Sequence, residues 1–261
     1  MESAQAAAAP RPSEPVSPAD RLIVALDLPS ATAAIEMVDE LQGVCRWFKV
    51  GMELYYAAGN TVVTHLRDRG FDVFLDLKLH DIPNTVAAAI RTVSSTGASL
   101  LTLHAAGGEK MMRAAVQAAS HPEAPRLLAV TVLTSMDAAD LNATGVSDST
   151  EAQVVRLAKL ACGIGVPGLV CSPQEVAAVR QAVGQDALLV VPGVRPTGEQ
   201  GSDDQARVAT PAQAIASGAS MLVVGRPITR ATEPAKAAAA ILEEIGRAES
   251  SGQVVVPGRG I

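Results

Sequence analysis

Residues 73–103 read VFLDLKLHDIPNTVAAAIRTVSSTGASLLTL. Two short apolar runs, at 73–77 and 100–103, enclose an Ala-rich stretch at 84–96. Such runs predict buried strands, and the Ala-rich stretch between them predicts a helix. A strand, a helix and a second strand form the repeating unit of parallel α/β folds.

The same unit recurs along the chain. Strand-like runs occur at 22–26, 47–50, 73–77, 100–103, 127–132, 168–170, 188–191 and 221–224. Candidate helices follow at 30–42, 52–69, 84–96, 108–119, 149–162, 173–183, 210–217 and 233–248. Two helices have predicted caps, because Ser172 precedes Pro173 and Thr210 precedes Pro211. Eight βα units predict the α/β class and a single (β/α)8 TIM barrel, which usually takes ~250 residues, in preference to an open doubly wound sheet.

The composition argues against several classes of protein. The formal net charge is −6, whereas a non-specific nucleic-acid binder shows a basic surface. Cys45, Cys162 and Cys171 have no C-x-x-C spacing, so we predict three buried reduced thiols rather than disulfides or a zinc site. The four histidines also lack metal-binding spacing, and no metal site is predicted. No apolar run approaches the ~20 residues that span a bilayer, so we expect no membrane contact.

Both ends of the chain differ in composition from the rest. Residues 1–20 are rich in Ala, Pro and Ser and lack the apolar segment of a signal peptide, which predicts a disordered N-terminal tail. Residues 250–261 contain three Gly and a Pro, which predicts a flexible C-terminal tail. The barrel is therefore expected over residues 21–249, and we expect the protein to be located in the cytoplasm.

Polar residues follow the predicted strands at their carboxyl ends, where barrel enzymes carry their active sites. They are Asp27, Lys49, Asp76, Lys78, Asp81, His104, Thr134, Ser135, Arg195 and Arg226, the last preceded by Gly225. This pattern predicts that the charged groups collect at one rim of the barrel.

Asp76 and Lys78 stand out within this set. They are two residues apart on one strand, so they share a face, which here is the barrel interior. A buried carboxylate and ammonium need each other as partners, and a purely structural ion pair is one explanation. Lys49 and Asp81 are expected to reach the same point. An alternating array of two lysines and two aspartates exceeds what structure requires and indicates catalysis.

Residues 74–85, FLDLKLHDIPNT, closely resemble the D-x-K-x-x-D-I-P-N-T pattern of the orotidine 5′-phosphate decarboxylase family. The resemblance extends from about Arg21 to about Ala248 through further motifs at Asp27, Lys49, His104, Thr134, Arg195, Gln205 and Arg226. It implies a carboxy-lyase that converts orotidine 5′-phosphate to UMP and CO₂, the last step of de novo UMP synthesis. It also implies a homodimer that needs no cofactor.

The resemblance implies a role for each matched residue. Lys78 would donate the proton, Asp76 would lie beside the substrate carboxylate, and Lys49 would connect the ribose to the acidic groups. Asp81 and Thr85 would be contributed across the dimer interface. The remaining matches are substrate-binding positions: Asp27 and Thr85 for the ribose, Thr134 and Ser135 for the pyrimidine, and Gln205, Gly225, Arg226 and nearby Arg195 for the phosphate.

These residue types suit the implied reaction. Loss of CO₂ leaves a carbanion at C6 in the plane of the ring, and the sequence offers no site for an electron-sink cofactor. A fixed ammonium at Lys78 can stabilise that charge and then protonate C6. Phosphate binding at Gly225 and Arg226 would supply energy to order the site. The segment 196–205 has the composition of a lid over the phosphate.

Two alternatives stay open. A metal-dependent sugar-phosphate synthase or decarboxylase of the same barrel group would resemble this chain in D-x-K-x-x-D and in the phosphate site. A non-catalytic nucleotide sensor is the second. His80 and His104 are predicted to pack or form hydrogen bonds rather than to catalyse, and Glu53 is predicted to be an ordinary charge on a helix face.

Overall fold

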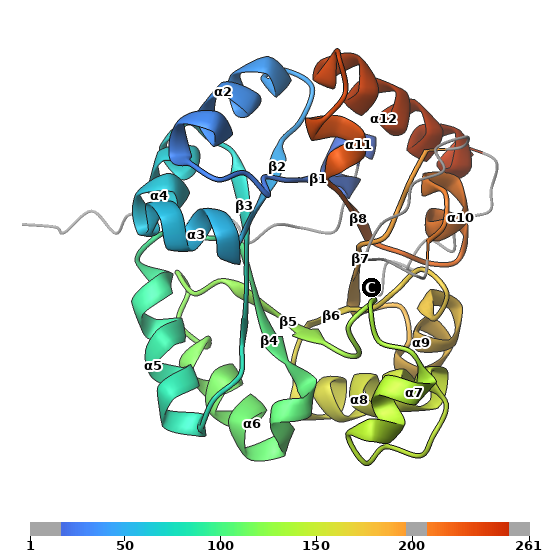
Figure 1. Cartoon of the computed structure of the whole chain (residues 1–261). Coiled ribbons are helices and arrows are strands. Elements are labelled where there is room, and N and C mark those ends of the chain that lie inside the picture. The colour runs from blue at the N-terminus through green and yellow to red at the C-terminus, as the bar shows by residue number, and fades with distance from the viewer. Residues whose placement is uncertain (1–16, 197–207, 251–261) are drawn as a thin grey trace, which may run out of the picture.

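Eight parallel strands form the centre of the molecule, and helices surround them (Figure 1). The computed structural model describes residues 17–196 and 208–250. The strands are β1 Leu22–Ala25, β2 Trp47–Gly51, β3 Asp72–Leu79, β4 Leu100–His104, β5 Arg126–Val130, β6 Gly168–Val170, β7 Leu188–Val191 and β8 Met221–Val224. Each strand pairs with the next, and β8 pairs with β1, so the barrel is closed. The predicted (β/α)8 barrel is confirmed, and all eight strands lie where the apolar runs placed them.

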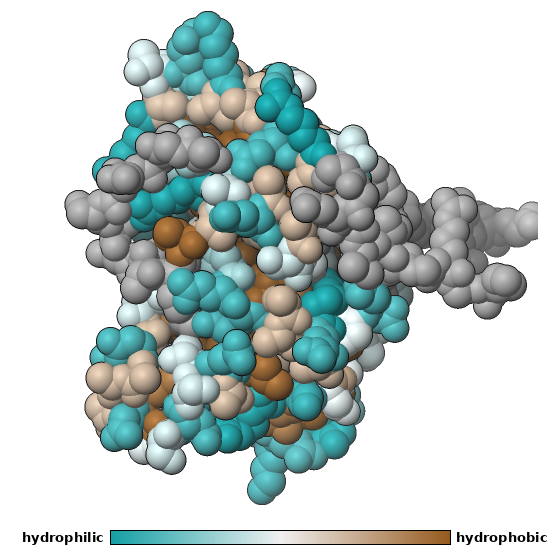
Figure 2. Space-filling view, turned by 90° about the vertical axis from the view of Figure 1, so that its right-hand side faces the viewer, coloured by the Kyte–Doolittle hydropathy of each residue, from teal (hydrophilic) through white to brown (hydrophobic). Residues whose placement is uncertain are grey.

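The helices surround this barrel. They are α1 Pro18–Arg21, α2 Ala31–Leu41, α3 Met52–Ala58, α4 Asn60–Asp68, α5 Pro83–Ser94, α6 Gly108–Ala118, α7 Ala138–Ala143, α8 Thr150–Ile164, α9 Val176–Val183, α10 Pro211–Ala216, α11 Arg226–Thr229 and α12 Pro234–Ser250, with a 3₁₀ turn, η1, at Ala105–Gly107. On the side of the barrel shown in Figure 2, hydrophobic residues are scattered among hydrophilic ones. The helices therefore turn their apolar faces to the sheet and mixed faces to solvent.

Three details of the helices differ from the sequence prediction. The single helix expected at 52–69 is two helices, because Gly59 adopts φ 64° between α3 and α4. The helix expected from residue 173 begins only at Val176, and Ser172 is not its cap, because its hydroxyl bonds the Glu175 carboxylate instead. The short helices α1, α7 and α11 were not predicted. The cap at Thr210 is confirmed, since its hydroxyl accepts the Gln213 N–H at 3.2 Å.

Apolar side chains form two separate cores. The larger lies between the sheet and the helices. The smaller fills the barrel interior with Ile23, Ala25, Trp47, Phe74, Leu100, Leu128, Leu188, Val190, Met221 and Val223. Because successive residues of a strand point to opposite faces, each strand contributes to both cores. The polar residues of the site lie directly above this interior core, towards the carboxyl ends of the strands.

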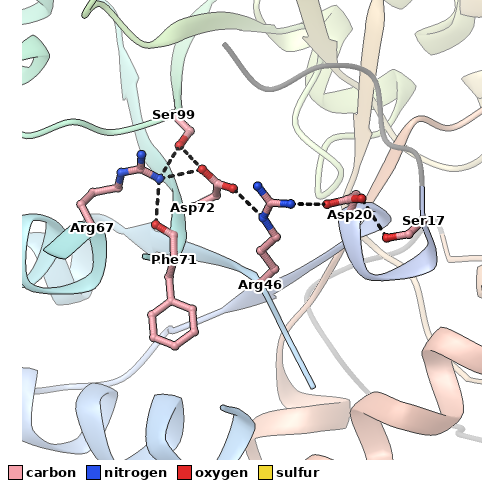
Figure 3. Close-up of polar contacts among 7 residues, drawn as sticks. All are labelled: Ser17, Asp20, Arg46, Arg67, Phe71, Asp72 and Ser99. Atoms are coloured by element: carbon pink, nitrogen blue, oxygen red, sulfur yellow. Dashed lines mark hydrogen bonds and ion pairs between the residues drawn. The ribbon is translucent and has the colours of Figure 1, made fainter. Parts of the chain in front are cut away.

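The amino-terminal ends of the strands carry a charged network of their own (Figure 3). The carboxylate of Asp72 accepts hydrogen bonds from Arg46 at 3.0 Å, Arg67 at 2.6 Å and Ser99 at 2.9 Å. Arg46 also bonds Asp20 of α1 at 3.1 Å. Most of the residues predicted at the carboxyl rim do line one cavity there, but the expectation that charges gather at that rim alone is wrong, because ion pairs also connect α1, α4 and the sheet at the opposite end.

The predicted tails lie mostly outside the described residues. Of residues 1–20 only 17–20 are described, and Pro18–Arg21 form α1. Of residues 250–261 only Ser250 is described, as the last residue of α12. Cys45 and Cys171 are buried as predicted, and burial raises the pKa of the Cys45 thiol to about 12. Cys162 is only half-buried, contrary to the prediction.

Candidate active site

The polar residues of the site occupy the inward positions directly above the interior apolar core. The pleat of a strand brings every second residue inward. Above Ala25, Trp47, Phe74 and Leu100 of the apolar core, the next inward positions on β1 to β4 are Asp27, Lys49, Asp76 and Thr102. The sequence thus changes from apolar to polar at one level of the barrel, near the carboxyl ends of the strands.

A cavity of about 720 Å³ opens at this level. Of the sequence-predicted residues it is lined by Asp27, Lys49, Asp76, Lys78, Thr134, Arg195, Gly225 and Arg226. Ser135 is exposed beside it and does not line it. Gln205 and the predicted lid beyond residue 196 lie outside the described residues.

Two lysines share one buried carboxylate in this cavity. Lys78 Nζ lies 2.8 Å from Oδ2 of Asp76, and Lys49 Nζ lies 3.5 Å from the same oxygen. Lys49 also donates to Asp27 at 2.8 Å. Burial alone would raise the pKa of Asp76, but the charges of both lysines and hydrogen bonds from Lys78 and Thr102 lower it below its usual 3.8. Asp76 is therefore a carboxylate held between two cations.

The strand that carries this pair is irregular. On β3, Leu75 pairs with Leu101 and Leu79 with Leu103, so the register shifts between them. Lys78 adopts φ 51°, the left-handed region that non-glycine residues rarely occupy. Its N–H bonds the side chain of Thr102 at 2.9 Å. The backbone at Lys78 is thus held in a special conformation within the site.

Asp81 and Thr85 are not brought to the cavity by this chain. Both are exposed, at the turn before α5 and in its first turn. The Asp81 carboxylate accepts the N–H of Ile82 at 2.6 Å. Two large side chains close in sequence to site residues are also exposed: Ile82, next to Asp81, to 67% and Tyr56 of α3 to 81%.

His80 and His104 lie against each other, with ring centroids 5.3 Å apart. Burial, and after it the positive charges of His80 and Lys78, lowers the pKa of His104 below its usual 6.5, while Asp76 acts in the opposite direction. Neither histidine lines the cavity. Their predicted packing role stays a prediction.

Cationic groups lie on the side of the cavity formed by β7 and β8. Arg195 follows β7, and Arg226 begins α11 directly after Gly225. Arg230 lines the same cavity and was missed by the sequence analysis, although it lies four residues, about one helical turn, after Arg226. This group of guanidinium ions favours an anionic ligand.

Three further site residues were missed or misjudged. Glu53, predicted to be an ordinary helix-face charge, lines the cavity. Thr102 was missed, although counting in steps of two from Leu100 would have found it. Gly51 was also missed: a Cβ there would lie 2.8 Å from both Asp27 Oδ1 and Lys49 Nζ. A side chain at position 51 would therefore disturb this ion pair.

Within residues 17–196 and 208–250, no three His, Cys, Asp or Glu side chains are grouped so that they could hold a metal ion. In the same residues, no helix is both long and apolar enough to cross a membrane.

Comparison with known proteins places the chain in a family. Residues 20–241 match the family model described as "Orotidine 5'-phosphate decarboxylase / HUMPS family". The chain belongs to this family. A family member from Anaeromyxobacter sp. (strain K), named orotidine 5'-phosphate decarboxylase, is 54% identical over 87% of this chain and 98% of that protein. A protein of the same name from Opitutus terrae is 50% identical over 86% of this chain and 97% of its own length.

Two solved structures resemble this chain as well. The crystal structure of orotidine 5'-phosphate decarboxylase from Lactobacillus acidophilus has a TM-score of 0.76 and 39% sequence identity, covering 86% of this chain and 98% of its own. An uncharacterized conserved protein from Geobacillus kaustophilus has a TM-score of 0.75 at 38% identity, covering 86% of this chain and 99% of its own.

Proposed function

We propose that this chain decarboxylates orotidine 5′-phosphate to UMP and CO₂, the last step of de novo UMP synthesis. Family membership and relatives that carry this name support the assignment. The observation that carries it is the pair of ammonium groups of Lys49 and Lys78 on the buried carboxylate of Asp76, inside an open cavity. A purely structural ion pair would have no reason to face a cavity of this size.

The cavity is large enough for a nucleotide, and its lining residues indicate how the phosphate, ribose and pyrimidine would be placed. Its volume of about 720 Å³ falls in the usual range of ligand pockets, roughly 300–1,000 Å³. The phosphate would bind Gly225, Arg226 and Gln205, with Arg195 close by. Asp27 and Lys49 would bind the ribose, and Thr134 the pyrimidine, whereas Ser135 does not line the cavity and is given no contact. The orotate carboxylate then lies on the side of β3.

The reaction needs no electron sink beyond the protein's own charges. The bond between C6 and the carboxylate breaks, CO₂ leaves, and the electron pair stays on C6. The Lys78 ammonium stabilises this charge and transfers a proton to C6, which completes UMP. The neutral amine then takes a proton from water. Asp76 holds the ammonium in place through its 2.8 Å contact.

A homodimer would complete the site. Asp81 and Thr85 are exposed, and Ile82 between them is a large apolar residue that a partner would cover. In a dimer Asp81 would approach the array of the partner subunit, and Thr85 its ribose site. Sedimentation of the full chain is expected to give a dimer, and Ile82→Asp to weaken it. The cytoplasmic location stays a prediction.

The decisive assay uses purified protein, orotidine 5′-phosphate and excess EDTA, followed by the absorbance change of the pyrimidine. We expect full turnover in EDTA. Turnover that requires an added divalent metal would favour the sugar-phosphate synthase or decarboxylase alternative. Binding of UMP without any turnover would favour the nucleotide sensor.

A further inference from the structure

The irregularity in β3 creates a bonding problem at Lys78. Leu75 pairs with Leu101 and Leu79 pairs with Leu103, so residues 76–78 all lie opposite the single residue Thr102. Three residues cannot all join a regular ladder with one, and a displaced N–H in a buried strand needs another acceptor. In this structure the N–H of Lys78 donates to Oγ1 of Thr102 at 2.9 Å.

The same hydroxyl also orients the carboxylate of Asp76. Thr102 is fully buried, and its Oγ1 donates to Oδ1 of Asp76 at 2.9 Å. A hydroxyl has one proton and two lone pairs. Because the Lys78 N–H uses a lone pair, the proton is free to point at Oδ1. The other oxygen, Oδ2, is thereby presented to the ammonium groups of Lys78 and Lys49, at 2.8 and 3.5 Å.

We infer that Thr102 is a positioning residue for the reaction, acting through both members of the central ion pair. This inference rests on the proposed decarboxylase function. One hydroxyl fixes the backbone of Lys78 in its left-handed conformation and sets the rotation of the Asp76 carboxylate. The Lys78 nitrogen is thereby directed into the cavity. Thr102 itself does not line the cavity and needs no contact with substrate.

The test compares Thr102→Val with Thr102→Ser. Valine keeps the shape of threonine but cannot accept from Lys78 or donate to Asp76, whereas serine retains both bonds. We expect Thr102→Val to lower kcat roughly 100-fold, the order of loss for an ångström-scale displacement of a catalytic group. KM and the affinity for UMP should stay close to wild type, because the phosphate and ribose contacts are unchanged. Thr102→Ser should recover most of kcat.

Thr96→Val is the matched control. Thr96 is also buried, and its hydroxyl also makes two bonds, to the carbonyl of Val93 at 2.7 Å and from the N–H of Ala98 at 3.3 Å. It lies in the turn between α5 and β4, at the other end of the barrel. This variant should lose stability but keep kcat.

The outcomes distinguish failure of the positioning role from failure of the proposed function. Wild-type kcat in Thr102→Val, equal losses of kcat in the valine and serine variants, or a loss in KM alone would overturn the positioning role. If the valine variant does not fold, Thr102→Ala removes the same hydroxyl with a smaller side chain and is judged by the same criteria. Absence of turnover in the wild type would overturn the proposed function itself, and the inference with it.

Discussion

The Nζ of Lys78 lies 2.8 Å from Oδ2 of Asp76, two residues earlier on the same strand. Both side chains line the cavity, and neither is buried in the apolar core below it. The contact therefore combines a fixed geometry with access to a ligand. Such an ammonium can stabilise negative charge that develops next to it without first reorganising its surroundings.

Lys78→Ala should lose at least about 10⁴-fold in kcat, because both charge stabilisation and the proton donor are removed. UMP should still bind, since Lys49 continues to neutralise Asp76 and the arginines are untouched. Stopped-flow decarboxylation and calorimetric titration with UMP measure the two effects. Lys110→Ala, on the exposed surface of α6, is the control and should behave as wild type. Appreciable turnover by Lys78→Ala would refute the role of Lys78.

Lys49→Met should destabilise the fold by about 2 to 3 kcal/mol at pH 7, because Asp76 keeps its burial but loses one of its two cations. Asp27 is more than half exposed and adds little to this loss. Lys49 contributes to a folded-state Asp76 pKa below the usual 3.8. Such a carboxyl adds stability above its unfolded-state pKa, and the contribution is lost as the pH falls through the folded-state value.

Urea unfolding of Lys49→Met and of wild type at a series of pH values tests this pH dependence of the free energy of unfolding. The difference in unfolding free energy between the two proteins should be largest above pH 3.8 and should decrease below it. A gap that widens on acidification would contradict the electrostatic explanation.

Arg226→Ala tests the anionic end of the cavity. Hydrogen bonds to charged groups are worth about 1.5–3 kcal/mol, so kcat/KM for orotidine 5′-phosphate should fall about 10- to 100-fold. The loss should be much smaller for orotidine, which has no phosphate. Arg91→Ala, on the outer surface of α5, serves as the control. Equal losses for both substrates would show that Arg226 does not recognise the phosphate.

His104 should make the fold sensitive to mild acid. Its folded-state pKa lies below the usual 6.5, so the unfolded chain takes up a proton in a pH range where the folded chain does not. Stability should therefore fall as the pH drops below 6.5, down to the folded-state pKa. The decline measured by urea unfolding should be shallower in His104→Gln. Parallel curves for the two proteins would rule out this contribution.

Asp72→Asn should lower the stability of the fold without changing the catalytic activity. Asp72 is buried at the base of the barrel, where Arg46 and Arg67 bond its carboxylate (Figure 3). Loss of its charge should cost about 2 to 3 kcal/mol in unfolding free energy, somewhat less than for a fully buried pair because the Arg46 side chain is 61% exposed. The value of kcat should not change, since the network lies at the opposite end from the cavity. A lowered kcat at full folding would show that the two ends are coupled.

The positions of the strands were predictable from the sequence because each contains a mainly apolar run that helices cover on the outside. The helix boundaries were predicted less accurately. Gly59 splits a stretch that otherwise has helical composition, and Ser172 bonds a side chain where it was expected to cap a helix. Both outcomes depend on local contacts that compete with propensity.

The central pair of the site was predictable as well, since residues two apart on a strand share a face. The contribution of Thr102 was not, because it depends on a register shift between β3 and β4 that leaves no mark in the sequence of either strand. The network around Asp72 was missed for a similar reason. Its members come from one strand, two loops and two helices that only the closed barrel brings together.

The most direct test is a crystal structure of the full chain with UMP bound. The Nζ of Lys78 is expected roughly 3 to 3.5 Å from C6 of the pyrimidine, the separation of atoms poised for transfer. A nucleotide seated elsewhere, or a Lys78 side chain turned towards solvent or the outer helices, would contradict the account.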